Sequence, residues 1–433
     1  MTKEKYHDWS VIDDPRYTER LDNSDPALTS MFDLLKQLQV VPNCPGFEQG
    51  IAREMVDILK PLCDEVQVDH FGNVYGKKTG KEGGPVIICP AHSDSCSFMT
   101  EYIEPSGYIR FTNMGCIPPY LAYGERMIII TKKGPVTGVV GTMPGHSNYN
   151  FAGSDGRMYP DENVLTPMYD NMYIDIGAKS AEEAIEMGVI PGQQAVFDRD
   201  LRWLGDGSSG MVTGAGLDDK AGLVVLIEVL KLLKGKDIYP TVYMVGAAME
   251  EIGCRGASVS GNYINADICI GVDGSVSEAG PESGIGVGVG TPPNITKSEL
   301  CASIGEGVGI ALNDIMMAAC TGLHGNHRIN TKMVQLARKL NIPYQVEAQA
   351  QYVTSDACSI QFTGVGGTPA ITLKLPIRYT HGPVETVSLY DMQACVQLLA
   401  AFIEECTPEG FDLKYVDIPE ADGGCTKNRD GIR

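Results

Sequence analysis

The sequence predicts an α/β fold, with a mostly parallel mixed sheet, helices on both of its faces and a small inserted β-rich domain. Three observations support this class. Apolar runs alternate with helical patterns from residue 211 onward, and interleaved strands and helices favour a parallel sheet. Residues 85–91 are an apolar run typical of a central parallel strand. Between residues 101 and 210, short β-like runs separated by Gly and Pro replace this alternation.

The first part of the chain predicts two helices, a hairpin and a strand. Residues 1–24 are polar and form an irregular extension. A helical pattern starts near Pro26 and a second covers residues 49–62. Residues 65–75 alternate around a turn at Gly72 and Asn73, which predicts a β-hairpin before the strand at 85–91. Residues 25–100 therefore form the first half of the larger domain.

Residues 101–210 are predicted to form the inserted domain. It has β-like runs at 127–131 and 135–140, a polar loop at 144–163 and a short helix at 180–187. Residues 211–415 complete the larger domain, and a polar extension follows at 416–433. In this second half we expect helices at 219–233, 256–263, 330–340 and 388–405, and strands at 240–249, 267–272, 307–312, 344–348 and 368–375.

Composition excludes some classes of protein. The net charge of −21 argues against nucleic-acid binding, because phosphate recognition needs a basic surface. No apolar stretch reaches the length needed to span a membrane. The polar N-terminus has no signal core, and the thirteen cysteines are odd in number and contain no Cys-x-x-Cys pair. We therefore expect reduced, buried thiols in a cytoplasmic protein with no membrane partner.

Two adjacent glutamates, Glu250 and Glu251, end the apolar run 241–249. Burying two like charges at a strand tip is costly unless a metal ion or a proton compensates. One glutamate on a metal and the other as a proton shuttle would remove this cost. The alternative is a solvated pair in the first turn of a helix, where acidic residues are favoured.

Similar side chains follow other strands of the predicted sheet. In open α/β sheets, ligands bind beyond the carboxyl ends of the strands, so loops far apart in sequence can converge there. The set has two imidazoles and several carboxylates but no thiol, which suits Zn, Co or Mn with open positions for catalysis. Its members are His92, Asp94, Asp218, Asp219, Glu250, Glu251, Asp273, His381 and Glu385.

Each member also has a structural interpretation. His92 fits a buried histidine in ordinary hydrogen bonds, Asp218 or Asp219 fits a helix cap, and Asp273 fits a turn. His324 and His327 offer another pair of imidazoles, in a segment more typical of a solvated loop. The chain has no Walker pattern and no Gly-x-Ser-x-Gly elbow.

Four segments together resemble a known family. The chain is similar to the metallo-aminopeptidases of the tetrahedral aminopeptidase and glutamyl aminopeptidase type, over about residues 30 to 410. These segments are Ala-His-Ser-Asp at 91–94, Gly-Leu-Asp-Asp-Lys-Ala-Gly at 216–222, Met-Glu-Glu-Ile-Gly-Cys-Arg-Gly-Ala at 249–257 and Arg-Tyr-Thr-His-Gly-Pro-Val-Glu at 378–385.

The resemblance implies a zinc-exopeptidase-like fold with a site for two divalent metal ions. Asp218 would bridge the two ions, His92 and Asp273 would complete one site, and Glu251 and His381 the other. Asp94 would hold the far nitrogen of His92, as metal-bound histidines usually require. The family also implies a cis peptide bond between Asp218 and Asp219.

The resemblance further implies an aminopeptidase that removes N-terminal residues from short peptides. A water shared by the two ions would attack the scissile bond as hydroxide, with Glu250 as general base. The inserted domain would form dimers, and twelve subunits would form a hollow tetrahedron. The alternatives are a related deacylase or carboxypeptidase, and a non-catalytic assembly protein of the same fold.

The chain departs from the family pattern in two places near these motifs. Ser95 stands where family members commonly have an acidic residue, and residues 353–356 (Val-Thr-Ser-Asp) replace a Gly-Thr-Asp segment. These changes leave the N-terminal residue preference open. The sequence also leaves open the native metal, the final oligomeric state, and the roles of the 144–163 loop and of both terminal extensions.

Overall fold

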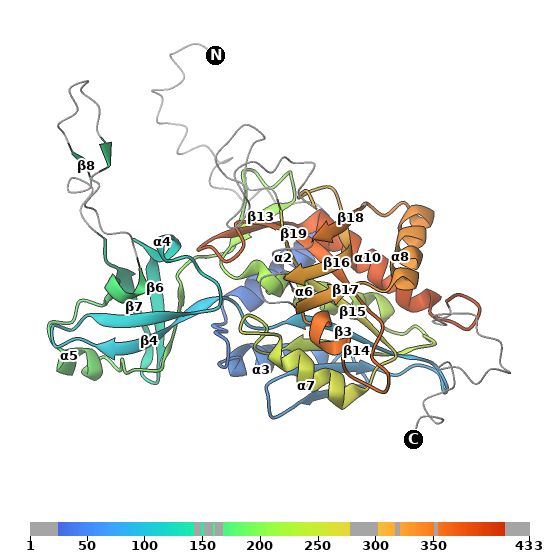
Figure 1. Ribbon diagram of the computed structural model, residues 1–433, viewed down its shortest axis with the longest axis horizontal. Coiled ribbons are helices and arrows are strands. Elements are labelled where there is room, and N and C mark those ends of the chain that lie inside the picture. The colour runs from blue at the N-terminus through green and yellow to red at the C-terminus, as the bar shows by residue number, and fades with distance from the viewer. Residues whose placement is uncertain are drawn as a thin grey trace, which may run out of the picture.

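The computed structural model describes residues 25–142, 149–150, 159–160, 168–277, 302–316, 321–349 and 354–411. The extensions at 1–24 and 416–433 and most of the 144–163 loop lie outside these residues. Two bodies are visible in Figure 1, a large α/β body and a smaller β-barrel beside it. No helix of the described part is long and apolar enough to cross a membrane.

The large body is built on a mixed sheet of twelve strands. Its centre is parallel, and both of its edges are antiparallel. The parallel centre consists of β14 (Thr241–Ala247), β3 (Val86–His92), β15 (Ile268–Val276) and β19 (Ala370–Arg378), in that order. The predicted α/β class with a mixed sheet is confirmed.

The remaining strands of the sheet extend these edges. On one side are β1 (Glu65–Val68) and β2 (Val74–Lys78); on the other are β20 (Glu385–Ser388), β13 (Met211–Gly214) and β12 (Arg202–Trp203). A branch from β19 carries β16 (Val308–Met316), β17 (Thr321–His324) and β18 (Tyr344–Gln349).

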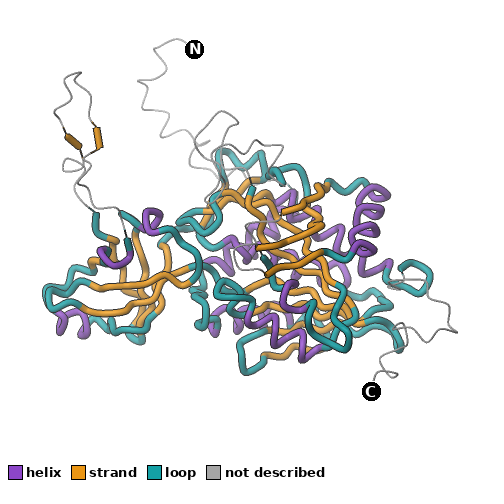
Figure 2. The backbone as a smooth tube through the Cα atoms, in the orientation of Figure 1, coloured by secondary structure: helices purple, strands orange, loops and turns teal. Residues whose placement is uncertain are grey.

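Helices cover both faces of this sheet, as the sequence predicts (Figure 2). Side chains of β3 alternate between the two faces: Ile87 and Cys89 pack in the larger core, whereas Ile88 packs in a smaller one. The larger core holds α2 (Pro26–Gln39), α3 (Gln49–Leu59), α6 (Leu217–Leu233), α8 (His327–Leu340) and α10 (Leu389–Glu405). The smaller core holds α7 (Arg255–Ile264) and α9 (Ala357–Ile360).

The barrel is the β-rich body expected from the sequence. It closes in the order β10-β5-β4-β11-β6-β7 around an aromatic core in which Phe98 meets Phe111 and Phe197 edge to face. Its strands are β4 (Ser97–Ile103), β5 (Ile109–Met114), β6 (Arg126–Thr131), β7 (Gly134–Val140), β10 (Ile174–Asp175) and β11 (Gln194–Phe197). Two short helices, α4 (Pro119–Ala122) and α5 (Ala181–Glu186), accompany them.

Candidate metal centre

The parallel order of the central strands brings the predicted site residues to one edge of the sheet. Ala247 at the end of β14 pairs with His92 at the end of β3, so Glu250 and Glu251 follow directly beside His92. Asp273 lies on β15, the other neighbour of β3. The loop after β19 supplies His381, which has a positive φ of 62°.

Asp218 lies between the two histidines. Its Oδ1 atom is 3.4 Å from His92 Nε2, and its Oδ2 atom is 3.6 Å from His381 Nε2. Asp218 precedes the regular part of α6 and has non-helical backbone angles. The peptide bond from Asp218 to Asp219 is cis, as the family resemblance implies.

The other expected ligands divide around Asp218 into two groups. Asp273 Oδ1 is 3.8 Å from His92 Nε2, on one side. Glu251 Oε2 is 3.3 Å from His381 Nε2, on the other. Glu250 Oε2 is 4.0 Å from His92 Nε2, and its carboxylate is not part of the Glu251 and His381 group. These predicted site residues thus lie together at one edge of the sheet.

The residues present fit divalent cations. Asp218 is 7% exposed, and its Oδ1 atom has no hydrogen-bond partner among the described residues. A buried carboxylate oxygen without a donor requires compensation, and a cation supplies it. Gly274 of β15 leaves the space, since a Cβ there would lie 2.7 Å from Asp218 Oδ1. Imidazole and carboxylate donors suit Zn, Co or Mn.

The Asp94 carboxylate has backbone partners in addition to the His92 contact that the resemblance implies. Its carboxylate accepts the backbone N–H groups of Glu250 at 2.9 Å and Glu251 at 3.1 Å. His92 Nδ1 is 2.9 Å from the backbone carbonyl of Asp94 but 3.7 Å from its Oδ1. The carbonyl is thus the nearer partner of the imidazole, and the carboxylate holds the backbone of the glutamate pair.

Glu385 and Asp219 hold the backbone of the site. The Glu385 carboxylate accepts the N–H of Asp218 at 2.9 Å and the N–H of His381 at 2.8 Å. Asp219 accepts the N–H of Gly222 in the first turn of α6, so the capping interpretation holds for this aspartate. It also accepts the N–H of His92 at 3.2 Å.

Cys96 places a thiol next to the predicted set, a neighbour that the sequence analysis does not include. Its Sγ is 3.0 Å from Glu251 Oε2, and its N–H donates to Glu251 Oε1 at 3.0 Å. Cys96, Glu251 and His381 form one of the groups whose ligand atoms lie within 4.8 Å of one another. The sequence signal was its position four residues after His92. His324 and His327 belong to none of the groups found among the described residues.

Burial and charge shift the pKa values of the site residues. Burial lowers the pKa of His92, but the facing carboxylates of Asp218 and Glu250 raise it more, so it lies well above the imidazole value. Burial also lowers the pKa of His381, but the neighbouring anions raise it more, and Glu251 has the largest effect among them. The pKa of His381 is therefore raised. Burial raises the pKa of Asp218, but the adjacent His92 imidazole brings it below the usual value.

Two buried lysines lie near these carboxylates. Lys374 Nζ is 3.0 Å from Asp314 Oδ2 and 3.8 Å from Asp273 Oδ2. Burial raises the pKa of Asp273 to about 7 even though Lys374 opposes the shift. Lys220 Nζ donates to Asn43 Oδ1 at 2.9 Å and to Ser95 Oγ at 3.1 Å, and burial lowers its pKa to about 8.

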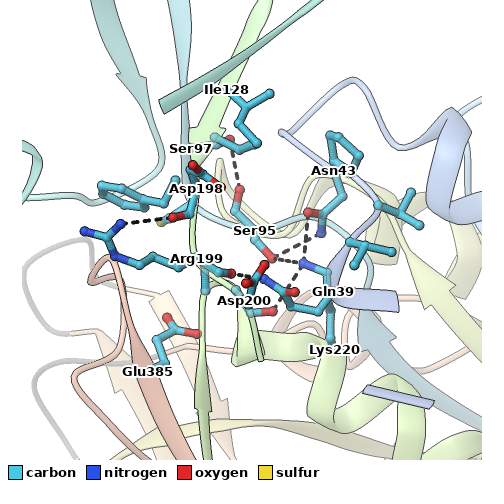
Figure 3. A pocket seen from close by; sticks show the side chains of 18 of the residues that line it. Gln39, Asn43, Ser95, Ser97, Ile128, Asp198, Arg199, Asp200, Lys220 and Glu385 are labelled. Atoms are coloured by element: carbon cyan, nitrogen blue, oxygen red, sulfur yellow. Dashed lines mark hydrogen bonds between the residues drawn. The ribbon is translucent and has the colours of Figure 1, made fainter. Parts of the chain in front are cut away.

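A cavity of about 190 Å³ lies beside this centre, between the barrel and the large body. His381, Cys96 and Glu385 reach its wall from the centre, and Lys220 reaches it from α6. Figure 3 shows Lys220 directed toward Asn43 and Ser95, with Asp198 and Arg199 on the barrel side. The pocket therefore depends on both bodies.

This fold and this set of side chains define the class of protein, a metal-dependent hydrolase. A family model for the M42 glutamyl aminopeptidases matches residues 72–398. The lysyl aminopeptidase of Pyrococcus furiosus is 29% identical over 381 residues, which cover 88% of this chain and 99% of that protein. The chain therefore belongs to the M42 glutamyl aminopeptidase family, and it is a metal-dependent aminopeptidase.

Solved structures support the same conclusion. An aminopeptidase of the archaeon Desulfurococcus kamchatkensis has a TM-score of 0.78 at 29% identity, covering 90% of this chain and 99% of that one. The TET1 peptidase of Pyrococcus horikoshii, which can assemble into a tetrahedron or a large octahedral shell, has a TM-score of 0.69 at 27% identity. That match covers 86% of this chain and 99% of the TET1 chain.

Proposed function

We propose that the chain is a dinuclear metal aminopeptidase that releases N-terminal residues from short peptides. The observation that supports two ions is the position of Asp218, whose two oxygens face different imidazoles. In this proposal, His92 and Asp273 complete one ion's ligands, and Glu251 and His381 complete the other's. Asp218 would offer one oxygen on each side.

Divalent cations held by these residues would lower the pKa of a bound water toward 7 and would polarise the scissile carbonyl. Glu250 would take up the proton of the attacking water and pass it to the departing amine. Burial raises the pKa of Glu250 well above its usual range, although His92 opposes the shift. A raised pKa suits a carboxyl group that must hold and release a proton. Glu251 is committed to the His381 side of the site.

The backbone around the glutamate pair keeps this division of roles. Asp94 fixes both backbone N–H groups, and Cys96 holds both carboxylate oxygens of Glu251. Glu250 instead receives the Cys254 thiol at 3.1 Å on Oε1. The two side chains are thereby directed to different partners.

A free N-terminal amine separates this proposal from a deacylase or carboxypeptidase with the same metal centre. The test is hydrolysis of an aminoacyl anilide and of its N-acetylated form, after metal removal and again after metal return. We expect turnover of the free amine only, restored by Zn, Co or Mn. Preferred cleavage of the N-acetylated substrate would indicate a deacylase. No hydrolysis by metal-loaded protein would favour a non-catalytic assembly protein.

We further propose that the barrel, whose strands lie between Ser97 and Phe197, pairs two subunits and that dimers build a larger homo-oligomer. The TET1 peptidase of Pyrococcus horikoshii supports this proposal, since it assembles into shells at 27% identity to this chain. All cysteines of the described residues are free thiols, which fits the cytoplasmic location we propose. Light scattering on the purified chain measures the assembly directly.

A further inference from the structure

A second group of side chains with metal-binding chemistry lies beside the proposed general base. Ligand atoms of Glu250, Cys254 and Asp356 lie within 4.8 Å of one another. All three residues are buried. Asp356 has no role in the proposed reaction, and Cys254 only donates a hydrogen bond to Glu250, so the group needs another explanation.

Asp356 is the member that points to a ligand. It is 3% exposed, and both of its carboxylate oxygens lack a hydrogen-bond partner among the described residues. A buried carboxylate without donors is costly unless a cation or a proton compensates. The sulfur atom of Cys254 and the carboxylate oxygens of Glu250 and Asp356 can act as ligands of a cation.

A second thiol lies next to Cys254. Cys358 Sγ is 3.8 Å from Cys254 Sγ. Two thiolates on one tetrahedral zinc ion, each about 2.3 Å from it, are separated by about 3.8 Å. The same spacing fits two thiols in simple contact, so the argument also needs the unpaired oxygens of Asp356.

The fold fixes these four groups from two separate segments. Cys254 directly precedes α7, whereas Asp356 and Cys358 belong to the start of α9. The two helices pack together on the same face of the sheet, where Cys254, Ala257, Ala357 and Cys358 share one core. The site therefore exists only in the folded chain.

We propose that Cys254, Cys358, Asp356 and Glu250 form a further cation site, selective for thiophilic divalent ions, and that its occupation inhibits the peptidase. The inhibition rests on the proposed role of Glu250. Binding of Zn²⁺ or Cd²⁺ releases the two thiol protons to solvent and leaves two thiolate ligands. The Glu250 carboxylate then ligates this ion and no longer accepts a proton from water. Mn²⁺, which prefers oxygen ligands, occupies the site poorly.

The first experiment counts cations without measuring activity. Chelator-treated protein is dialysed against Zn²⁺ or Cd²⁺, and the bound metal is measured by inductively coupled plasma mass spectrometry. We expect wild type to bind one more ion per subunit than Cys254→Ser, Cys358→Ser or Asp356→Asn. The matched control is Cys63→Ser, a partly buried thiol beside Gly76 of β2, and it should bind as wild type does.

Ultraviolet absorption identifies the ligands. Cadmium bound to thiolate absorbs by charge transfer, and the Cys254-dependent part of this band should disappear in Cys254→Ser and Cys358→Ser. In Cys96→Ser the Cys254-dependent absorption should remain. Any absorption that the Cys96 thiol contributes is thereby distinguished from it. In activity assays, the Zn²⁺ concentration that halves each enzyme's own rate should rise about 10–100-fold in the Cys254, Cys358 and Asp356 variants.

Several results would overturn this proposal. Equal cation counts in wild type, Cys254→Ser and Asp356→Asn would remove the site. A Cys254–Cys358 disulfide in mass spectra of freshly reduced and re-equilibrated protein would make the thiols a redox pair instead. Binding of the extra ion without a fall in kcat would remove the inhibition. A different result tests the dinuclear proposal. It predicts two ions per subunit that remain bound in the Cys254→Ser, Cys358→Ser and Asp356→Asn variants.

Discussion

Lys374 and Asp273 face each other across neighbouring strands, with Lys374 Nζ 3.8 Å from Asp273 Oδ2. The pair arises from the parallel register of β15 and β19, in which these residues are direct partners. The Lys374 side chain has no solvent exposure, and it also contacts Asp314 at 3.0 Å. A permanent positive charge thus supports one edge of the proposed metal centre.

Replacing Lys374 by Met leaves Asp314 and Asp273 buried without their cation. Breaking a buried ion pair on one side typically costs about 3–5 kcal/mol. We expect a loss of this size in urea unfolding of the metal-free protein. The double variant Lys374→Met/Asp314→Asn should recover part of it, because one of the two uncompensated carboxylates is then removed. A single variant as stable as wild type would contradict this account.

Gly274 controls the space around Asp218. In Gly274→Ala the new Cβ would lie 2.7 Å from Asp218 Oδ1, so the carboxylate must move. We expect metal affinity to fall about 10–100-fold, as for other disturbances of ligand orientation. Gly271→Ala on the same strand is the control, because its closest new contact is Ala357 Cβ at 3.2 Å. The metal that each variant retains after dialysis against a chelator measures this effect. Equal retention in Gly274→Ala and Gly271→Ala would contradict the prediction.

The glutamate pair should separate proton transfer from metal binding. Glu250→Gln should keep its metal and lose about 10²–10⁴-fold in kcat, the usual contribution of a general base. Glu251→Gln should lose metal as well, because its oxygen faces His381. Metal content and anilide turnover are measured on the same samples. Equal metal occupancy and equal residual activity in the two variants would disprove the assignment.

Asp94→Asn tests which partner the Asp94 carboxylate serves. Asparagine keeps one acceptor oxygen, so either Glu250 or Glu251 loses its backbone acceptor. The carbonyl that orients His92 remains. We expect kcat to fall about 10–100-fold, with a smaller change in bound metal. Loss of metal with unchanged turnover per bound ion would assign the carboxylate to His92 instead.

The raised pKa of the buried Glu347 carboxyl group should make the stability of the protein depend on pH. Burial raises its pKa to about 7, although Lys374 and the Ser275 hydroxyl oppose the shift. A glutamate in the unfolded chain titrates near about 4.3, so between these values only the folded state holds the proton. Stability therefore falls as pH rises through this window.

Glu347→Gln removes this titration. Between pH values of about 5 and 7, the metal-free variant should lose less stability than wild type, by on the order of 2 kcal/mol. Urea unfolding at the two pH values measures the difference. A variant that follows wild type over the whole range would show that Glu347 does not titrate there.

Local pattern was enough to predict most of the elements that position the site. The helix at 219–233, the strand at 240–249 and the central strand at 85–91 correspond to α6, β14 and β3. The periodicity of apolar residues encodes these elements directly. Less regular segments were missed: β20 and β13 are four residues each, and neither has a pattern that separates it from a loop.

The sequence by itself determined the chemistry at the strand ends, because His92, Asp218, Glu250, Glu251, Asp273 and His381 stand at recognisable breaks between apolar runs. Only the tertiary structure decided which side chains meet. Lys374 reaches Asp273 through the order of strands β15 and β19, and Cys254 reaches Cys358 through the packing of α7 against α9. The physical reason is that periodicity reports the neighbours of a residue along the chain, whereas contacts between distant segments depend on strand order and register.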